Sequence, residues 1–188
     1  MHSQDIAIIG ILLACAAIAR LAANIIPTPI VSNLAIGFYC LAIILTMPKI
    51  SEALGIGIVA GIICAMISHS IYPPANLISE PVGVLVCLAV YGLLANRTKF
   101  SAEITTFLAT CASGFTFVLV ALIMATPAIA GRFAEINSTL IDLALPFFIA
   151  MSPIVIGTAI ANSIVVGLLV RPATRVIQGS SGPSDNSD

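Results

Sequence analysis

The stretch ISHSIYPPANLISEP, residues 67–81, decides how this chain divides into helices. The apolar sequence on its two sides could be mistaken for one long span. The Tyr-Pro-Pro sequence at 72–74 interrupts any helix, because proline lacks a backbone N–H and its ring clashes with the preceding turn. The stretch therefore separates two predicted spans, and it places a carboxylate, Glu80, just inside the second one.

The composition predicts an integral membrane protein. The chain has 188 residues, of which 60% are hydrophobic and only 8% are charged, and its mean hydropathy is +1.16. A soluble domain carries about 25% charged residues, so this chain has too few charges to cover a water-exposed surface. We expect a multi-pass protein of the cell membrane, with lipid as its main solvent.

The apolar runs predict an all-α bundle of six transmembrane helices. Each run has roughly the 17–25 residues that cross a bilayer core of about 30 Å. No internal repeat or soluble domain is evident, so residues 1–175 form one predicted transmembrane domain and 176–188 a disordered polar tail. The runs cover approximately residues 5–26, 30–47, 53–71, 76–95, 103–126 and 144–170.

Lysine and arginine in the short connections predict the orientation. With an even number of spans, both termini lie on one side, together with Lys49, Arg97, Lys99, Arg171 and Arg175. The opposite side holds Arg20 and Arg132. Basic residues are enriched in cytoplasmic loops, so both termini are expected in the cytoplasm.

Several functional classes lack their sequence signals. The five cysteines each stand alone in an apolar run, which is typical of small buried side chains rather than of metal or disulfide sites. No nucleotide-binding, metalloprotease or nucleophile-elbow motif occurs, and no basic patch suggests nucleic acid. We expect no catalytic residues, no metal and no cofactor.

Glu80 is the residue that most invites a functional interpretation. Residues 82–95 alone would extend roughly 21 Å as a helix, which is shorter than the bilayer core. We therefore expect 76–81 to enter the membrane as irregular backbone or a loose first turn that lines a cavity, since such backbone is tolerated only there. Alternatively, Glu80 occupies the first turn of a helix and complements its dipole.

Arg20 lies near the end of the first span, on the same predicted side as Glu80. Alone, it could extend its long side chain up to the lipid headgroups. Together, the two residues could bind a zwitterionic ligand, with the ligand carboxylate on the guanidinium and the ligand ammonium on the carboxylate. A direct structural ion pair between them is the competing interpretation.

Four further residues complete the predicted binding set. His69 and Tyr72 could contact a ligand or simply prefer the membrane interface. Asn76 is at least as well explained as a helix cap. The predicted substrate-binding residues are thus Arg20, Asn24, His69, Tyr72, Asn76 and Glu80.

Small residues dominate the first span. Gly10 and Ala14, and likewise Ala19 and Ala23, have the small-xxx-small spacing that lets another helix approach closely. Packing within the bundle explains such a stripe somewhat better than an external partner.

The stretch MPKISEALGIGIVAGIICAMISHSIYPPANLISEPVGVLV, residues 47–86, resembles the tryptophan-specific branch of the S components of energy-coupling factor (ECF) transporters. These are the substrate-binding membrane subunits of importers. The similar features are a Pro-basic turn, a helix of the pattern GIV-GI-A, and the element NLISEPV. The similarity covers the first half of the chain and consists of patterns of small and apolar residues.

The resemblance implies a membrane-embedded binding protein rather than an enzyme. It would capture tryptophan, a related amino acid or a vitamin outside the cell. A transmembrane coupling subunit and two cytoplasmic ATPase subunits would then drive release inward. In that family the small stripe of the first span contacts the coupling subunit, which carries over to Gly10 and Ala14.

The residues alone leave two other functional classes open. A self-contained secondary transporter or channel should show an ionisable path to mid-membrane, yet no charge occurs between Glu103 and Arg132 or between Asp142 and Arg171. A membrane assembly subunit without a ligand would pair its outer polar groups with each other. Ligand binding to the purified protein separates the second class from a receptor.

Overall fold

The computed structural model describes residues 2–23, 33–133 and 139–180, and these residues form helices without any strand. The predicted all-α class is therefore confirmed. Five helical segments are long and apolar enough to cross a membrane, whereas α2, with 12 residues, is shorter. The elements are α1 (Ser3–Ala23), α2 (Ala35–Thr46), α3 (Ile50–Ile67), the 3-10 helix η1 (Pro73–Ala75), α4 (Asn76–Leu94), α5 (Ser101–Met124), α6 (Thr126–Phe133) and α7 (Leu140–Ser180).

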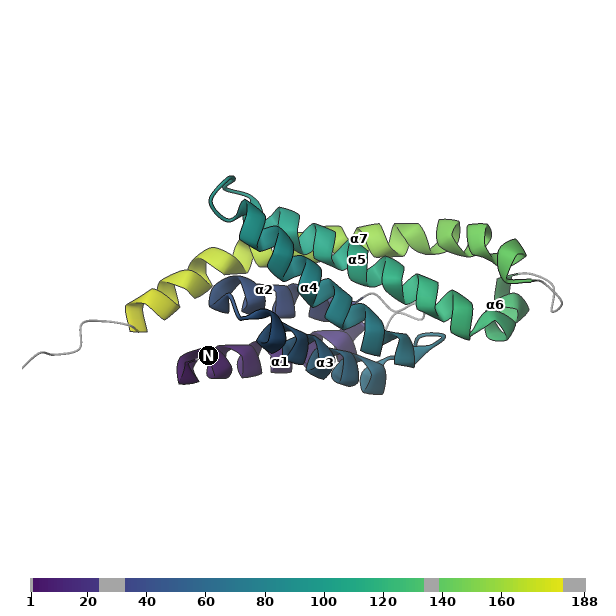
Figure 1. Ribbon diagram of the computed structural model, residues 1–188, viewed down its shortest axis with the longest axis horizontal. Helices are drawn as coiled ribbons and strands as arrows, with labels where there is room; N and C mark the ends of the chain where they lie inside the picture. The colour runs from purple at the N-terminus through teal and green to yellow at the C-terminus, as the bar shows by residue number, and fades with distance from the viewer. Residues whose placement is uncertain (1, 24–32, 134–138, 181–188) are drawn as a thin grey trace, which may run out of the picture.

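The short helix α2 lies at the centre of an elongated bundle (Figure 1). It packs against α1, α3, α4, α5 and α7. Nine of its 12 residues are buried. A helix surrounded by other helices has little contact with lipid, which explains how α2 can be shorter than the bilayer core.

The connection between α2 and α3 is a three-residue turn. Met47 takes a left-handed conformation with φ 41° and donates its N–H to the carbonyl of Ile43 at 2.8 Å. Pro48 follows and prevents α2 from continuing. The backbone N–H of Lys49 then donates to the Glu52 carboxylate at 2.8 Å, which caps the start of α3. This turn lies where the sequence predicts a break.

The connection between α3 and α4 corrects one expectation. A break at Tyr-Pro-Pro is present, because α3 ends at Ile67 and η1 leads into α4. However, α4 is a regular helix from Asn76 through Pro81, so the expected irregular backbone is wrong. Its 19 residues extend about 28 Å, close to a bilayer core. Glu80 is past the first turn of α4, so the alternative of a first-turn acid is also wrong.

Glycine on α3 allows the start of α4 to remain helical and buried. A Cβ on Gly57 would lie 2.7 Å from the Cα of Pro81, and one on Gly61 would lie 2.9 Å from the carbonyl oxygen of Asn76. The backbones of the two helices thus approach each other directly, as small residues four apart permit. Asn76, Ser79 and Glu80 are therefore buried on the side of a regular helix rather than by irregular backbone.

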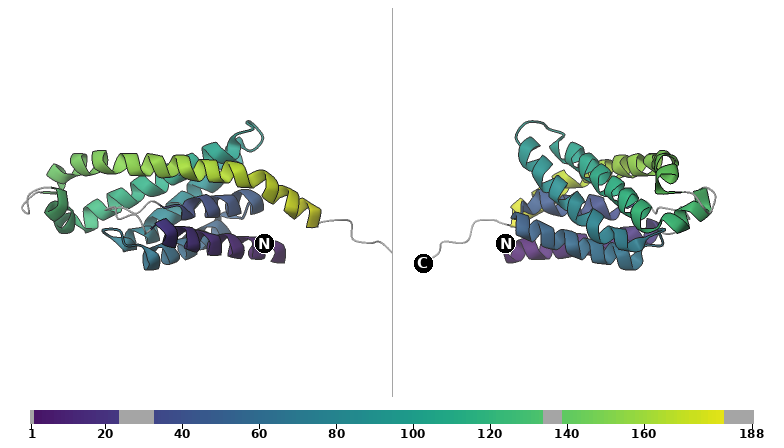
Figure 2. Two further views of the ribbon diagram at one scale, coloured as in Figure 1. Left: turned by 180° about the vertical axis from the view of Figure 1, so that it is seen from behind. Right: turned by 45° about the vertical axis from the view of Figure 1, so that its right-hand side comes forward.

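The helices α5 and α7 lie side by side along the bundle, and α7 continues past the other helices (Figures 1 and 2). A capping box formed by Thr139 and Asp142 begins α7. The backbone N–H of Thr139 donates to the Asp142 carboxylate at 3.0 Å. The helix has 41 residues and contains Pro146, Pro153 and Pro172. It reaches Ser180, and the rest of the predicted tail lies outside the described residues.

Figure 1 places the start of α1 and the end of α7 at the same end of the bundle. The α2–α3 and α4–α5 connections lie at this end too. The predicted grouping of Lys49, Arg97, Lys99, Arg171 and Arg175 with the two described ends agrees with this arrangement. The short helix α6 was not predicted; it lies at the opposite end, after α5.

We expect Gly57→Ala to destabilise the protein by about 1–3 kcal/mol, because the added Cβ would overlap the backbone of Pro81. Gly55→Ala is the matched control, since a Cβ on Gly55 would meet nothing within 4 Å. Thermal unfolding of the two purified variants in one detergent measures the difference. Equal melting temperatures would show that the α3–α4 contact is looser than described.

Candidate functional site

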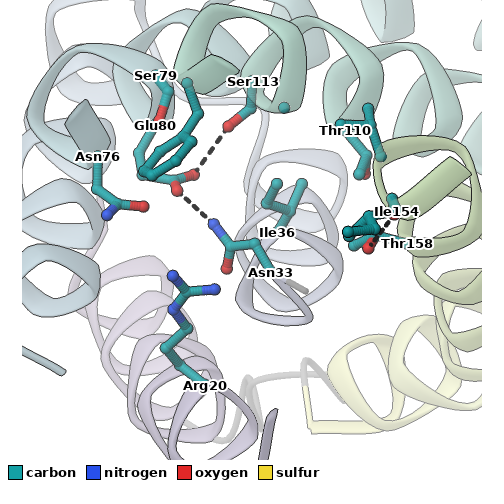
Figure 3. Close-up of a pocket in the computed structure, with 13 residues that line it drawn as sticks. Arg20, Asn33, Ile36, Asn76, Ser79, Glu80, Thr110, Ser113, Ile154 and Thr158 are labelled. Carbon is teal, nitrogen blue, oxygen red and sulfur yellow. Dashed lines mark hydrogen bonds between the residues drawn. The ribbon is translucent and has the colours of Figure 1, made fainter. Parts of the chain in front are cut away.

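A small cavity lined by both polar and apolar residues lies where two apolar clusters of the bundle meet. One cluster centres on α2 and includes Tyr39 and Val84, and the other joins α5, α6 and α7 around Phe117 and Phe147. The cavity has a volume of about 30 Å³, which suffices for a few waters. Its lining residues are Arg20, Asn33, Ile36, Asn76, Ser79, Glu80, Thr110, Ser113, Gly114, Phe117, Ile154, Val155 and Thr158 (Figure 3).

Glu80 lies on the cavity wall, and its side chain is completely buried. Its carboxylate accepts hydrogen bonds from the hydroxyl of Tyr39 on α2 at 2.8 Å and from the hydroxyl of Ser113 on α5 at 3.3 Å. The side-chain amide of Asn33 donates to the other carboxylate oxygen. A buried charge requires such donors. Glu80 on α4 is therefore hydrogen-bonded to two other parts of the chain, residues 33–39 and α5.

Gly83 makes room for the Tyr39 hydroxyl. A Cβ at this position would lie 2.5 Å from that hydroxyl and 2.9 Å from the Cβ of Ser113. Gly83 follows Glu80 by three residues, so it presents nearly the same face of α4. The absence of a side chain there allows α2 and α5 to bring their hydroxyl groups to the carboxylate.

Arg20 also lines the cavity, and only 1% of its surface is exposed. The idea that Arg20 extends to the lipid headgroups is therefore wrong; its guanidinium instead turns into the bundle and donates to the Ser68 hydroxyl at 2.7 Å. The hydrogen bonds of Glu80 come from other residues, so Arg20 and Glu80 do not form the hydrogen-bonded ion pair considered above. In the view of Figure 3, the Asn33 side chain lies between them.

Asn162 joins α7 to this polar centre. Its amide nitrogen donates to the backbone carbonyl of Asn33 at 3.0 Å and to the Thr110 hydroxyl at 3.3 Å. Its amide oxygen faces Gly37, where a Cβ would lie only 3.1 Å away. Asn33 thus has two roles, because its side chain binds Glu80 while its backbone binds α7.

The structure brings together three of the six predicted binding residues: Arg20, Asn76 and Glu80 line one cavity. Asn76 also donates its side-chain amide to the Pro73 carbonyl at 2.7 Å, which closes the turn before α4. His69 is exposed, and Tyr72 packs against the second apolar cluster, so neither lines the cavity. Asn24 lies outside the described residues.

Sequence reasoning missed Asn33, Tyr39, Thr110, Ser113 and Asn162. It considered mainly charged residues, whereas these are neutral polar residues inside or beside apolar runs. One signal was available in 103–126, where Thr106, Thr110 and Ser113 recur at helical spacing and mark one polar face. No spacing along the chain, however, links that face to Glu80.

Gly10 and Ala14 point away from the bundle. Both are exposed, and a Cβ on Gly10 would meet nothing within 4 Å. The interpretation that this pair packs inside the bundle is therefore wrong. Other members of α1 do pack inward, including Ala16 and Ala23, which lie on a different face of the helix.

The chemistry of the cavity suits binding of a small polar molecule. Among the described residues, no group of three or more His, Cys, Asp or Glu side chains could hold a metal ion. The hydroxyl of Ser79 lines the cavity and is fully buried without a hydrogen-bond partner in the described part of the chain. The cavity thus combines a cation, a carboxylate and a hydroxyl with spare hydrogen-bonding capacity.

Comparison with protein-family models, with curated proteins and with solved structures found no match to this chain. What the structure establishes, for the residues it describes, is a helical bundle with five helical segments long and apolar enough to cross a membrane and a small cavity between its helices.

Proposed function

We propose that this protein is a membrane-embedded receptor for a small zwitterionic molecule of the amino-acid class. One observation carries the proposal: a buried arginine and a buried glutamate line the same cavity without hydrogen bonding to each other. Charges at membrane depth are costly and usually mark functional sites. Two opposite charges kept apart on one cavity suit a ligand that itself carries both signs.

The ligand would bind through charge-assisted hydrogen bonds at its two ends. Its carboxylate would contact the guanidinium of Arg20, and its ammonium would contact the carboxylate of Glu80. Such bonds are roughly twice as strong as neutral ones, and the low dielectric of the bundle strengthens them further. The Ser79 hydroxyl could accept another ammonium hydrogen, because it has no partner in the described part of the chain.

The apolar part of the wall favours a ligand with an apolar side chain. Ile36, Phe117, Ile154 and Val155 all line the cavity together with the polar residues. With about 30 Å³, the cavity is too small for an amino acid as it stands, so side chains or helices must move when the ligand enters. Tryptophan, suggested by the resemblance, is the first ligand to test, followed by smaller amino acids.

We further propose that the receptor works as the S component of an ECF-type importer in the cell membrane. The exposed pair Gly10 and Ala14 supports this proposal, because a face without side-chain bulk suits close docking of a coupling-subunit helix. Two cytoplasmic ATPase subunits would supply the energy. Both termini would lie in the cytoplasm, as the distribution of lysine and arginine favours.

Glu80→Gln and Arg20→Gln should each weaken binding of a zwitterionic ligand by about 1.5–3 kcal/mol, or roughly tenfold to over a hundredfold, because each removes one charge-assisted contact. Equilibrium binding of radiolabelled L-tryptophan, and then of a panel of smaller L-amino acids, to detergent-purified protein measures the change. Mass spectrometry of small molecules that co-purify provides an independent identification.

Glu103→Gln and Arg97→Gln are the matched controls for these variants. Glu103 lies in the first turn of α5 and Arg97 lies in the α4–α5 connection, and neither lines the cavity. Wild-type affinity in both Glu80→Gln and Arg20→Gln would contradict the proposed site. Failure of the wild-type protein to bind any amino acid would contradict the proposed ligand class.

Gly10→Trp and Ala14→Trp should reduce uptake by cells that express the protein with its partner subunits, while ligand affinity of the purified protein stays nearly unchanged. The large side chain would block close helix approach. Gly55→Trp on α3 is the control, because Gly55 is equally open. Normal uptake in the α1 variants would remove this face from the partner contact.

The orientation is tested by cysteine labelling in a background without native cysteines. A membrane-impermeant maleimide should label His69→Cys and Pro74→Cys on intact cells, since both residues are exposed at the predicted outer end. Ser51→Cys and Lys99→Cys, at the opposite end, should react only after permeabilisation. Labelling of Lys99→Cys on intact cells would reverse the topology.

A further inference from the structure

The two buried charges of the cavity raise a physical question that their separation alone does not answer. Opposite charges in a medium of low dielectric attract strongly, and Arg20 has a long flexible side chain that lines the same cavity as Glu80. If nothing held them apart, they would be expected to form a direct ion pair. Such a pair would occupy both groups that a zwitterionic ligand needs.

Each charge has hydrogen-bond partners other than the opposite charge. The guanidinium of Arg20 donates to the Ser68 hydroxyl at 2.7 Å, at the end of α3. Tyr39 and Ser113 hold Glu80 from α2 and α5. Ser68 ends α3, whereas Tyr39 and Ser113 lie on α2 and α5, so different helices orient the two charged groups.

Ser68 is itself fixed by a neighbouring serine. The backbone N–H of Ser70 donates to the Ser68 hydroxyl oxygen at 3.2 Å, and the two hydroxyl oxygens lie 2.7 Å apart. A serine oxygen has two lone pairs and one hydrogen. Because Arg20 and the Ser70 N–H use both lone pairs, the hydrogen of Ser68 points to the Ser70 hydroxyl. All hydrogen-bonding capacity of the Ser68 hydroxyl is therefore used.

We infer that Ser68, oriented by Ser70, is a positioning residue that holds Arg20 away from Glu80 and so keeps the binding site open to a zwitterion. This inference rests on the proposed function. Ser68 and Ser70 are buried but do not line the cavity, so they would act on a ligand only through Arg20. In Ser68→Ala, the guanidinium would turn to Glu80 and close the site with the protein's own charges.

Ser68→Ala should lower the affinity for L-tryptophan or the amino acid that proves to bind by about tenfold, although no ligand contact is deleted. Ser68→Thr, which keeps the hydroxyl, should restore affinity to within about threefold. Ser163→Ala is the matched control, because its hydroxyl bonds only to its own helix, at the carbonyl of Ala159. Wild-type affinity in Ser68→Ala would overturn the inference.

A double-mutant cycle decides the same question without any ligand. When Ser68 is present, the effects of Arg20→Gln and Glu80→Gln on thermal stability should be nearly additive. In the Ser68→Ala background, where Arg20 and Glu80 would form an ion pair, the two effects should be strongly coupled. Additive effects in both backgrounds would overturn the inference even if the receptor binds amino acids. Coupling confined to Ser68→Ala would support it even if no amino acid binds, and would then count only against the proposed ligand.

Ser70→Ala provides a second variant if Ser68→Ala does not fold. It leaves the bond between Arg20 and Ser68 in place but removes the group that orients Ser68. In the Ser70→Ala background, the coupling between Arg20→Gln and Glu80→Gln should be present but smaller than in Ser68→Ala. Its absence, with the folded variant otherwise stable, would show that Ser68 holds Arg20 without help.

Discussion

The cost of burying a carboxylate in an apolar bundle governs this structure. Glu80 is fully buried on a helix whose neighbours are mainly apolar, so it must find hydrogen-bond donors within the protein. It obtains them from Asn33 and Tyr39, just before and within α2, and from Ser113 on α5. Asn33 in turn binds Asn162 of α7 through its backbone carbonyl. The hydrogen bonds of one buried carboxylate thus bring α2, α4, α5 and α7 together around Glu80.

Close approach of the helices makes these hydrogen bonds possible. Gly57 and Gly61 let α4 lie directly on α3, and Gly83 leaves space for the Tyr39 hydroxyl. Gly37 accommodates Asn162 in the same way. In lipid, helices gain little from hydrophobic association, so van der Waals packing and polar contacts between helices supply the stability. The small residues and the polar centre therefore depend on each other: glycine brings the backbones together, and the buried side chains specify which faces meet.

The placement of the two buried charges differs from the one that stability alone would favour. A protein built only for stability would pair Arg20 with Glu80 or replace both with apolar residues, since an apolar substitute is often as stable as a buried ion pair. Here both charges line one cavity, and each has hydrogen-bond partners other than the opposite charge. Functional sites commonly depart from the arrangement that stability alone would favour. The separation of Arg20 and Glu80 is such a departure, and it underlies both the proposed receptor role and the positioning role of Ser68.

The sequence by itself determined the helical fold, the apolar segments long enough to cross a membrane and the positions of most breaks, because hydrophobicity, proline and charge act locally along the chain. It also singled out Arg20 and Glu80, since charges inside apolar runs are rare. Only the tertiary structure decided that α4 is regular through Pro81, that Gly10 and Ala14 face outward, and which neutral side chains surround Glu80. Those outcomes depend on how each helix is rotated and how closely it packs. Residues 33, 39, 80 and 113 meet only after the helices assemble, and no local pattern encodes that meeting.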